Sequence, residues 1–270
     1  MRRSWWVYLI AVLGLIAVAA PFAWMFLGSF KTQGELLRVP PTWLPEAPTN
    51  QNYAELLSKA NFPQYFVNSA IVAIAVTAGN LTFCSMVGYS LAKLRFRGRN
   101  ALFVLVLATL MIPGVVTFVP LFVLVTNAGL ANSYPGLILP FLVSPFGVFL
   151  MRQFFSGLPD DLMDAGRVDG TSELGIFARI MLPLTRPALA TLGILTFLGS
   201  WNNFLWPLVA AQSQKMYTLP VALSLYSTGE NATNYGLLLA GSVLVIAPIV
   251  LLFVLLQRFF IQSVATAGIK

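Results

Sequence analysis

Long apolar runs alternate with short polar segments along the whole chain. A run of about 20 residues spans a hydrocarbon core of about 30 Å, because an α-helix rises 1.5 Å per residue. We therefore expect one all-α transmembrane domain over residues 1–270, whose six helices are predicted at residues 5–30, 66–91, 101–125, 134–151, 188–210 and 237–256. The first apolar run follows Arg2 and Arg3, and a basic start before an apolar run is also typical of a signal peptide. The length of this run favours an uncleaved span.

The composition supports a membrane protein and excludes several kinds of site. Hydrophobic residues make up 58% of the 270 positions and charged residues 9%, against roughly 25% charged residues in soluble domains. Histidine is absent and Cys84 is the single cysteine. These counts exclude a disulfide within the chain, His-based metal sites and His-based catalytic triads.

The basic residues predict the orientation in the membrane. Lysine and arginine are enriched in cytoplasmic loops. With both termini inside the cell, twelve basic residues are cytoplasmic, and the other four, Lys31, Arg38, Lys59 and Lys215, fall in external loops at residues 31–64 and 212–234. The net charge of +7 comes from short clusters beside apolar runs, so it indicates topology rather than nucleic-acid binding.

A polar stretch at residues 158–187 interrupts the apolar pattern and is expected to lie in the cytoplasm. Pro159, followed by two aspartates, predicts a helix start, and Gly170 predicts its end. Thr171 or Ser172 can cap a second helix with an apolar stripe that includes Phe177. The pattern alone fits either a solvated loop or an L-shaped pair of helices that contacts a partner.

The spacing within this stretch resembles a known signature. Asp164-Ala165-Gly166, three residues, Gly170, nine residues, Ile180, one residue and Leu182-Pro183 are similar to the "EAA, G, I, LP" pattern of permease subunits of binding-protein-dependent ABC importers. The sequence departs from that pattern at Asp164, which replaces a glutamate, and at Gly166, which replaces an alanine. Other segments, among them residues 197–203 and 217–220, resemble the maltose-type carbohydrate permeases of this family.

The resemblance implies an importer of the bacterial cytoplasmic membrane. This chain would pair with a second permease subunit, two ATPase subunits that bind ATP and Mg, and an extracytoplasmic solute-binding protein. It would hold no cofactor itself, and it has no phosphate-binding glycine loop with lysine. The implied function is import of a carbohydrate or a related polar solute by alternating access. The implied ATPase-coupling residues are Asp164, Ala165, Gly166, Arg167, Gly170, Phe177, Ile180 and Pro183.

Two further sites follow from the sequence and the resemblance. An aromatic and amide-rich patch, Trp201, Asn202, Asn203 and Trp206, is unusual for membrane depth. It fits either the lining of a sugar path or polar contacts between helices. The predicted external loop at residues 212–234 resembles the one that reaches the binding protein in maltose-type permeases. This resemblance suggests contacts with the binding protein at Tyr217, Thr218 and Glu230.

A secondary, ion-coupled transporter is the alternative. Such a transporter normally carries ionisable groups within its spans. None of the nine acidic residues falls inside a predicted span, which argues against this class.

Overall fold

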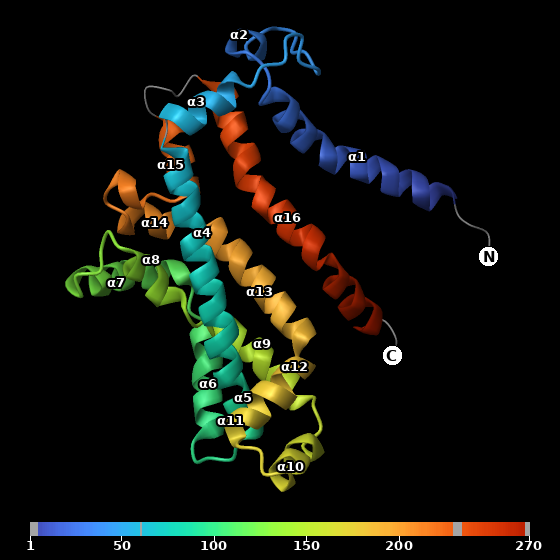
Figure 1. Cartoon of the computed structure of the whole chain (residues 1–270), viewed down its shortest axis with the longest axis vertical. Helices are drawn as coiled ribbons and strands as arrows, with labels where there is room; N and C mark the ends of the chain where they lie inside the picture. Colours follow the sequence, from blue (N-terminus) through green and yellow to red (C-terminus); the bar gives the residue numbers. More distant parts are fainter. Residues whose placement is uncertain (1–4, 60, 229–233, 268–270) are drawn as a thin grey trace. The chain divides into compact units, whose positions relative to one another are not determined.

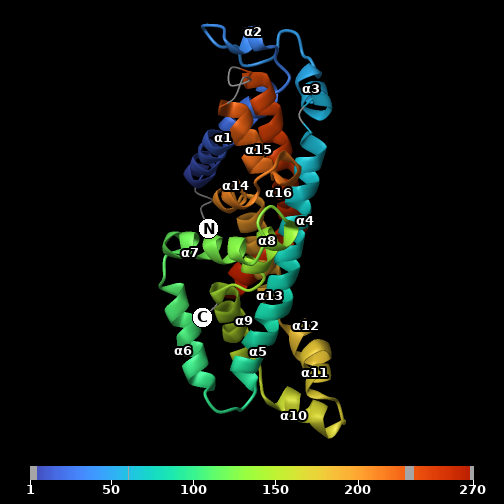
Figure 2. The same ribbon diagram turned by 90° about the vertical axis from the view of Figure 1, so that its left-hand side faces the viewer.

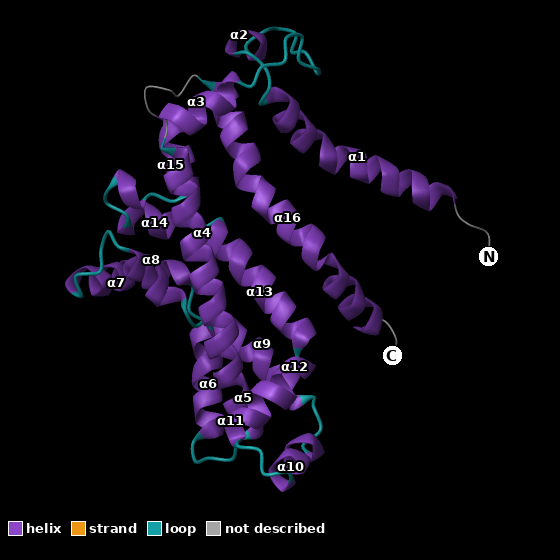
Figure 3. Ribbon diagram, in the orientation of Figure 1, coloured by secondary structure: helices purple, strands orange, loops and turns teal. Residues whose placement is uncertain are grey.

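The computed structural model describes residues 5–59, 61–228 and 234–267. Within these residues the chain consists of helices and loops only, as Figure 3 shows, so the all-α prediction is confirmed. The chain forms two compact units, one of residues 1–66 with 219–250 and the other of residues 67–218 with 251–270.

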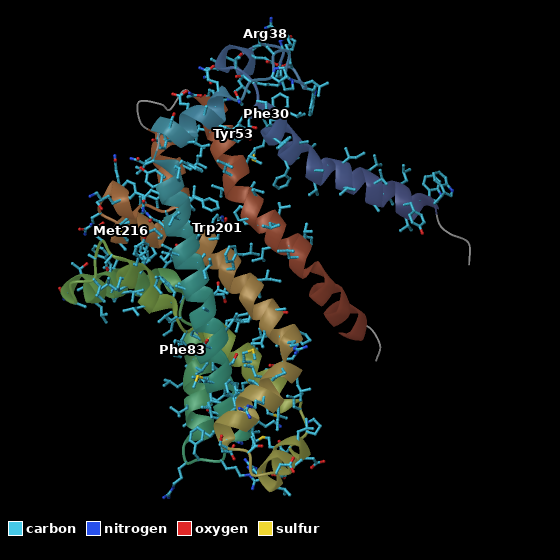
Figure 4. All side chains as sticks on the ribbon, viewed as in Figure 1. Phe30, Arg38, Tyr53, Phe83, Trp201 and Met216 are labelled. Atoms are coloured by element: carbon cyan, nitrogen blue, oxygen red, sulfur yellow. The ribbon has the colours of Figure 1, made fainter. Side chains whose placement is uncertain are left out.

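The first unit contains the N-terminal helix and the loop that follows it. Its helices are α1 (Trp5–Gly28), α2 (Gln33–Leu36), α3 (Gln51–Lys59), the start of α4 (Phe62–Gly79), α15 (Leu219–Thr228) and the N-terminal half of α16 (Tyr235–Ala267). Gly28 ends α1 in close contact with α16, because a Cβ there would lie 2.7 Å from the Leu239 side chain. The rings of Phe30 and Tyr53, both labelled in Figure 4, lie 5.3 Å apart.

The loop at residues 31–64, predicted to be external, has its own polar core. Lys31 is 1% exposed and donates hydrogen bonds to the carbonyl and the hydroxyl of Thr42. The Thr42 hydroxyl in turn donates to the carboxylate of Glu35 at 2.7 Å, and this bond lowers the Glu35 pKa. The Asn52 amide donates to the carbonyls of Ser29 and Lys31. Buried hydrogen bonds therefore hold this loop in one conformation.

The second unit contains a long helix and several broken ones. The long helix continues from α4 through a π-helical turn (Asn80–Cys84) into α5 (Ser85–Lys93). The remaining helices are α6 (Arg99–Leu110), α7 (Gly114–Asn127), α8 (Tyr134–Ile138), α9 (Pro145–Ser156), α10 (Asp161–Val168), α11 (Glu173–Gly175), α12 (Leu182–Leu184), α13 (Arg186–Trp201) and α14 (Leu205–Ala210).

The helices long and apolar enough to cross a membrane alone number three in the described part, namely Trp5–Gly28, Phe62–Lys93 and Tyr235–Leu255. Three bent pairs bring the number to as many as six: Arg99–Leu110 with Gly114–Asn127 at 101°, Tyr134–Phe141 with Pro145–Ser156 at 42°, and Glu173–Leu184 with Arg186–Trp201 at 82°. The six-span count stays a prediction. Figure 2 shows the first bend clearly between α6 and α7, and Pro113 at this point explains the break.

Several helix ends differ from the predicted spans. The run predicted at 188–210 divides at Asn202, and α14 follows as a separate helix whose Trp206 amide donates to the Asn203 side chain. The segment predicted as an external loop at 212–234 contains the ten-residue helix α15. Leu219 and Val221 are fully buried there, so this polar-looking segment has an apolar face that the composition concealed.

Candidate coupling elbow and membrane cavity

The polar stretch at residues 158–187 forms a bent pair of helices, which we call the elbow. Its first helix, α10, ends in a Schellman motif: Thr171 N–H donates to the Gly166 carbonyl at 2.9 Å and Gly170 N–H donates to the Arg167 carbonyl at 3.0 Å. Gly170 has a φ of +71°, a left-handed conformation that favours glycine. Ser172 caps the second helix by accepting from Gly175 N–H at 3.2 Å.

The inner face of the elbow packs on the helices of the second unit. Met163 and Gly166 are the buried residues of α10. A Cβ at Gly166 would lie 2.9 Å from the Ile180 side chain and 3.1 Å from that of Ile176. The Phe177 ring lies 5.2 Å from that of Tyr89 in α5. Apolar contacts therefore fix the C-terminal end of α10, its distal end, to the second helix of the elbow and to the helices of the second unit.

The apolar stripe of the second helix differs from the predicted one. Leu174, which a 3.6-residue period places beside Phe177, is 66% exposed, whereas Ile176 and Met181 are fully buried. Residues Ile176–Met181 form a π-helical turn, which has more residues per turn than an α-helix and shifts the buried face. Ile180 and Pro183 are half-buried beside this face.

The outer face of the elbow carries charged groups that pair at the surface. Arg167 donates to Asp164 at 2.9 Å and to Glu173 at 2.7 Å. The Glu173 bond, followed by the Asp164 bond, raises the pKa of Arg167. All three side chains are between 44% and 68% exposed, and Ala165 beside them is exposed as well. Such surface pairs contribute little to stability, about 1 kcal/mol or less, so this face remains available for a partner.

Lys93 and Asp160 form a contact that the sequence analysis missed. The Lys93 ammonium lies 2.5 Å from the Asp160 carboxylate and 2.5 Å from the Leu158 carbonyl. This bond from Lys93 lowers the Asp160 pKa. The two residues are 67 positions apart, so no local spacing could have indicated the pair. Figure 1 shows α10 at the end of the second unit that also holds the C-terminal end of α5.

A cavity of about 660 Å³ opens between this end of α5 and the elbow. It is lined by Lys93, Leu94, Arg95, Phe96, Asp160, Met163, Asp164, Arg167 and Glu173. The lining contains four of the charged residues that make ion pairs in the elbow. This charged cavity therefore borders both the inner contact of Lys93 and the outer face of α10.

A second cavity, of about 450 Å³, lies between α4, α7, α9, α13 and α14. Asn203 and Trp206 line it, together with the polar side chains of Asn80, Thr117, Ser144, Thr196 and Ser200. Trp201 and Asn202, the other two residues of the predicted patch, do not line this cavity. Trp201 is 2% exposed and stacks on Phe197, while the Asn202 amide donates to the carbonyl of Leu198 one turn earlier.

Beside this cavity, Asn80 replaces a backbone hydrogen bond that is missing where the helix breaks before Pro145. Pro145 has no N–H, so it cannot bond the carbonyl of Phe141 as a continuous helix would require. The Asn80 amide donates to this carbonyl at 2.7 Å, and its oxygen accepts from the Ser144 hydroxyl at 2.6 Å. Unpaired backbone groups are costly at membrane depth, so Asn80 stabilises the break.

Two other asparagines order the segment that follows α14. Asn132 accepts from the backbone N–H of Gln212 and of Ser213, each at 3.0 Å. Asn68 donates to the carbonyl of Tyr217 at 2.8 Å. Of the predicted binding-protein contacts, Tyr217 is half-buried, Thr218 is 4% exposed and Glu230 lies outside the described residues.

Residues 84–266 match the model of the family described as "Binding-protein-dependent transport system inner membrane component". The chain belongs to this family. The match runs from the end of the π-helical turn through the elbow and the second cavity to the last described helix. The chain is therefore a membrane-embedded permease component of a binding-protein-dependent transport system, not itself an enzyme, and an ion-coupled transporter is not favoured.

Relatives and solved structures extend over nearly the whole chain. The arabinooligosaccharides transport system permease protein AraQ of Halalkalibacterium halodurans is 45% identical over 96% of this chain and 94% of that protein. AraQ of Bacillus subtilis is 44% identical over 93% and 90%, and the diacetylchitobiose uptake system permease protein NgcG of Streptomyces coelicolor is 35% identical over 94% and 85%. A bacterial ABC transporter that imports the acidic polysaccharide alginate has the same fold, with a TM-score of 0.86 at 22% identity over 96% of this chain and 97% of that one.

Proposed function

We propose that this chain is a permease subunit of an ATP-driven importer of oligosaccharides. The observation that carries this proposal is the 45% identity, over 96% of the chain, with a permease for arabinooligosaccharides. A second relative of the same name at 44% identity supports the same substrate class. Arabinooligosaccharides are therefore the first substrates to test.

The second cavity is proposed to lie on the sugar path. Its polar groups come from the π-helical turn, α7, α13, α14 and the connections before α9 and α14. Asn203 and Trp206 lie where α13 ends and α14 begins. Amides and hydroxyls in a largely apolar cavity suit a ligand with many hydroxyl groups. The Trp206 indole N–H is already bonded to the Gly136 carbonyl at 3.1 Å. Trp206 therefore shapes the wall, and Asn203 is the candidate for a direct contact with sugar.

The elbow is proposed to be the contact with the ATPase. Its outer face combines exposed charges at Asp164 and Arg167 with the exposed side chain of Val168, while its inner face is fixed by packing. A rigid element between two proteins transmits movement better than a loose one. We assign ATP and Mg to two ATPase subunits, and a second permease subunit completes the pore.

The orientation follows from this assignment. The elbow and both termini face the cytoplasm of a bacterial cell, in agreement with the distribution of basic residues. The segment that contains Tyr217 and Glu230 then faces outward, towards the solute-binding protein.

The test is transport by the purified complex in liposomes. The chain would be co-expressed with the permease, ATPase and binding protein encoded by neighbouring reading frames. We expect uptake of labelled arabinooligosaccharide that requires ATP and the binding protein and that persists when the proton gradient is dissipated. Uptake that needs the gradient and ignores ATP would overturn the proposal.

A further inference from the structure

The residue just before α10 lacks the local hydrogen bond that its position favours. Asp160 occupies the N-cap position of α10, where an aspartate normally accepts a hydrogen bond from the backbone N–H groups of the first turn. No side-chain capping bond is made there. The carboxylate instead accepts from Lys93, at the end of a different helix.

The two partners differ in exposure, because the Lys93 side chain is buried and the Asp160 side chain is exposed. The side chain of Lys93 is 4% exposed and that of Asp160 is 71% exposed. The ammonium also donates to the Leu158 carbonyl, so it contacts both ends of the short connection between α9 and α10. A buried ammonium requires such acceptors, because loss of its hydration is costly without them.

Lys93 belongs to a rigid part of the second unit. It is the last residue of the helix that runs from Phe62 through the π-helical turn. Earlier in the same helix, Gly88 lies so close to α9 that a Cβ there would be 2.8 Å from the backbone nitrogen of Arg152. Force applied to Lys93 therefore reaches α5 and α9 together.

Contacts of two kinds hold α10. Apolar packing fixes Gly166 against Ile176 and Ile180, which lead into α13, and buries Met163 beside Tyr89 of α5. The N-cap residue, Asp160, is held by the ammonium of Lys93, the last residue of α5. The ion pair is therefore the polar contact that fixes the start of α10 to a helix earlier in the chain.

We propose that Lys93 is a positioning residue for transport, fixing the start of α10 to the helix Phe62–Lys93 so that movement of the elbow also moves this span. The proposal rests on the coupling role of the elbow proposed above. The pair acts without touching solute or ATP. Its loss leaves α10 held by apolar packing alone, through Met163 and Gly166, so movement of the elbow reaches the helix Phe62–Lys93 less completely.

The test is a double-mutant cycle in the reconstituted complex, with Lys93→Met, Asp160→Asn and both changes together. The readout is the number of ATP molecules hydrolysed per sugar imported. We expect each single change to raise this ratio about fivefold, the size of a typical coupling between sites. The double variant should match the singles instead of multiplying them, because both changes remove the same contact.

Arg97→Met is the matched control, since Arg97 is an exposed basic residue in the loop that follows Lys93. It should leave the ratio unchanged. If Lys93→Met fails to assemble, Asp160→Asn alters an exposed side chain and carries the test alone. A normal ratio in Asp160→Asn, or effects of the two single changes that multiply in the double variant, would overturn the role of Lys93. A normal ratio for changes at Gly170 as well would instead overturn the coupling role of the whole elbow.

Discussion

The elbow and the wall of the second cavity place their polar residues in opposite ways, exposed in the elbow and buried in the wall. In the elbow, Asp164, Arg167 and Glu173 stay exposed while apolar residues hold the structure together. In the cavity wall, Asn80 is 1% exposed and bonds a carbonyl that Pro145 leaves free. Charges outside can meet a partner without changing the fold, whereas amides inside set the shape of the cavity. Substitutions on the outer face of the elbow should therefore leave the stability unchanged and impair the coupling of ATP hydrolysis to import. Substitutions of buried amides in the cavity wall should lower the stability and leave the coupling unchanged.

Gly170→Pro should have the largest effect. Proline cannot adopt the φ of +71°, and it removes the N–H that bonds the Arg167 carbonyl, at a local cost of about 3 kcal/mol. We expect an inserted complex that hydrolyses ATP but imports sugar more than about tenfold more slowly. Membrane insertion, ATP hydrolysis and uptake are measured on the same preparation. Full uptake would show that the bend at Gly170 is not needed.

A matched pair on α10 separates packing from recognition. Gly166→Leu places a side chain against Ile176 and Ile180, and such overpacking costs about 2 kcal/mol. Ala165→Leu adds the same side chain on the exposed face and should change stability by less than about 0.5 kcal/mol. Thermal unfolding of the purified complex checks both values. Equal destabilisation by the two changes would contradict the assignment of inner and outer faces.

Asn80→Leu tests the cavity wall. The change removes the hydrogen bonds to the Phe141 carbonyl and the Ser144 hydroxyl, and polar contacts within membranes average about 0.6 kcal/mol each. We expect a loss of about 1 kcal/mol and an unchanged ratio of ATP to sugar. Asn202→Leu removes one exposed hydrogen bond, to the Leu198 carbonyl, and should cost less than about 0.6 kcal/mol. A larger effect at Asn202 than at Asn80 would contradict the account of the helix break.

The smallest expected effect is that of pH on the contact between Lys93 and Asp160. Because the Asp160 pKa is lowered, the stabilisation is present at neutral pH and is lost only as the pH falls through this lowered pKa. The ratio of ATP to sugar should therefore stay constant when the cytoplasmic-side pH falls from about 8 to about 6, both well above the ordinary aspartate pKa of about 3.9. A rise across this interval would show that another group controls the coupling.

The features visible in the sequence were those that depend on neighbouring residues. Apolar runs predicted the helices, and the order of proline, aspartate and glycine predicted α10 and its end at Gly170. The π-helical turn at Ile176–Met181 shifted the buried stripe, because its extra residue per turn leaves no mark in a 3.6-residue pattern. The partners of Lys93 and Asn80 lie 67 and 61 positions away, so only the folded chain brings them together.

Charge reversal at Asp164 tests the central claim most directly, because this residue is 68% exposed and its only ion pairing in the described residues is with Arg167. In liposomes that contain the complete complex, Asp164→Arg should insert and fold like the unaltered chain. It should hydrolyse ATP with little or no import of sugar, which would place the function of the elbow on its outer face. Import at the unaltered rate, with the usual ratio of ATP to sugar, would contradict the claim that α10 couples the ATPase to the pore.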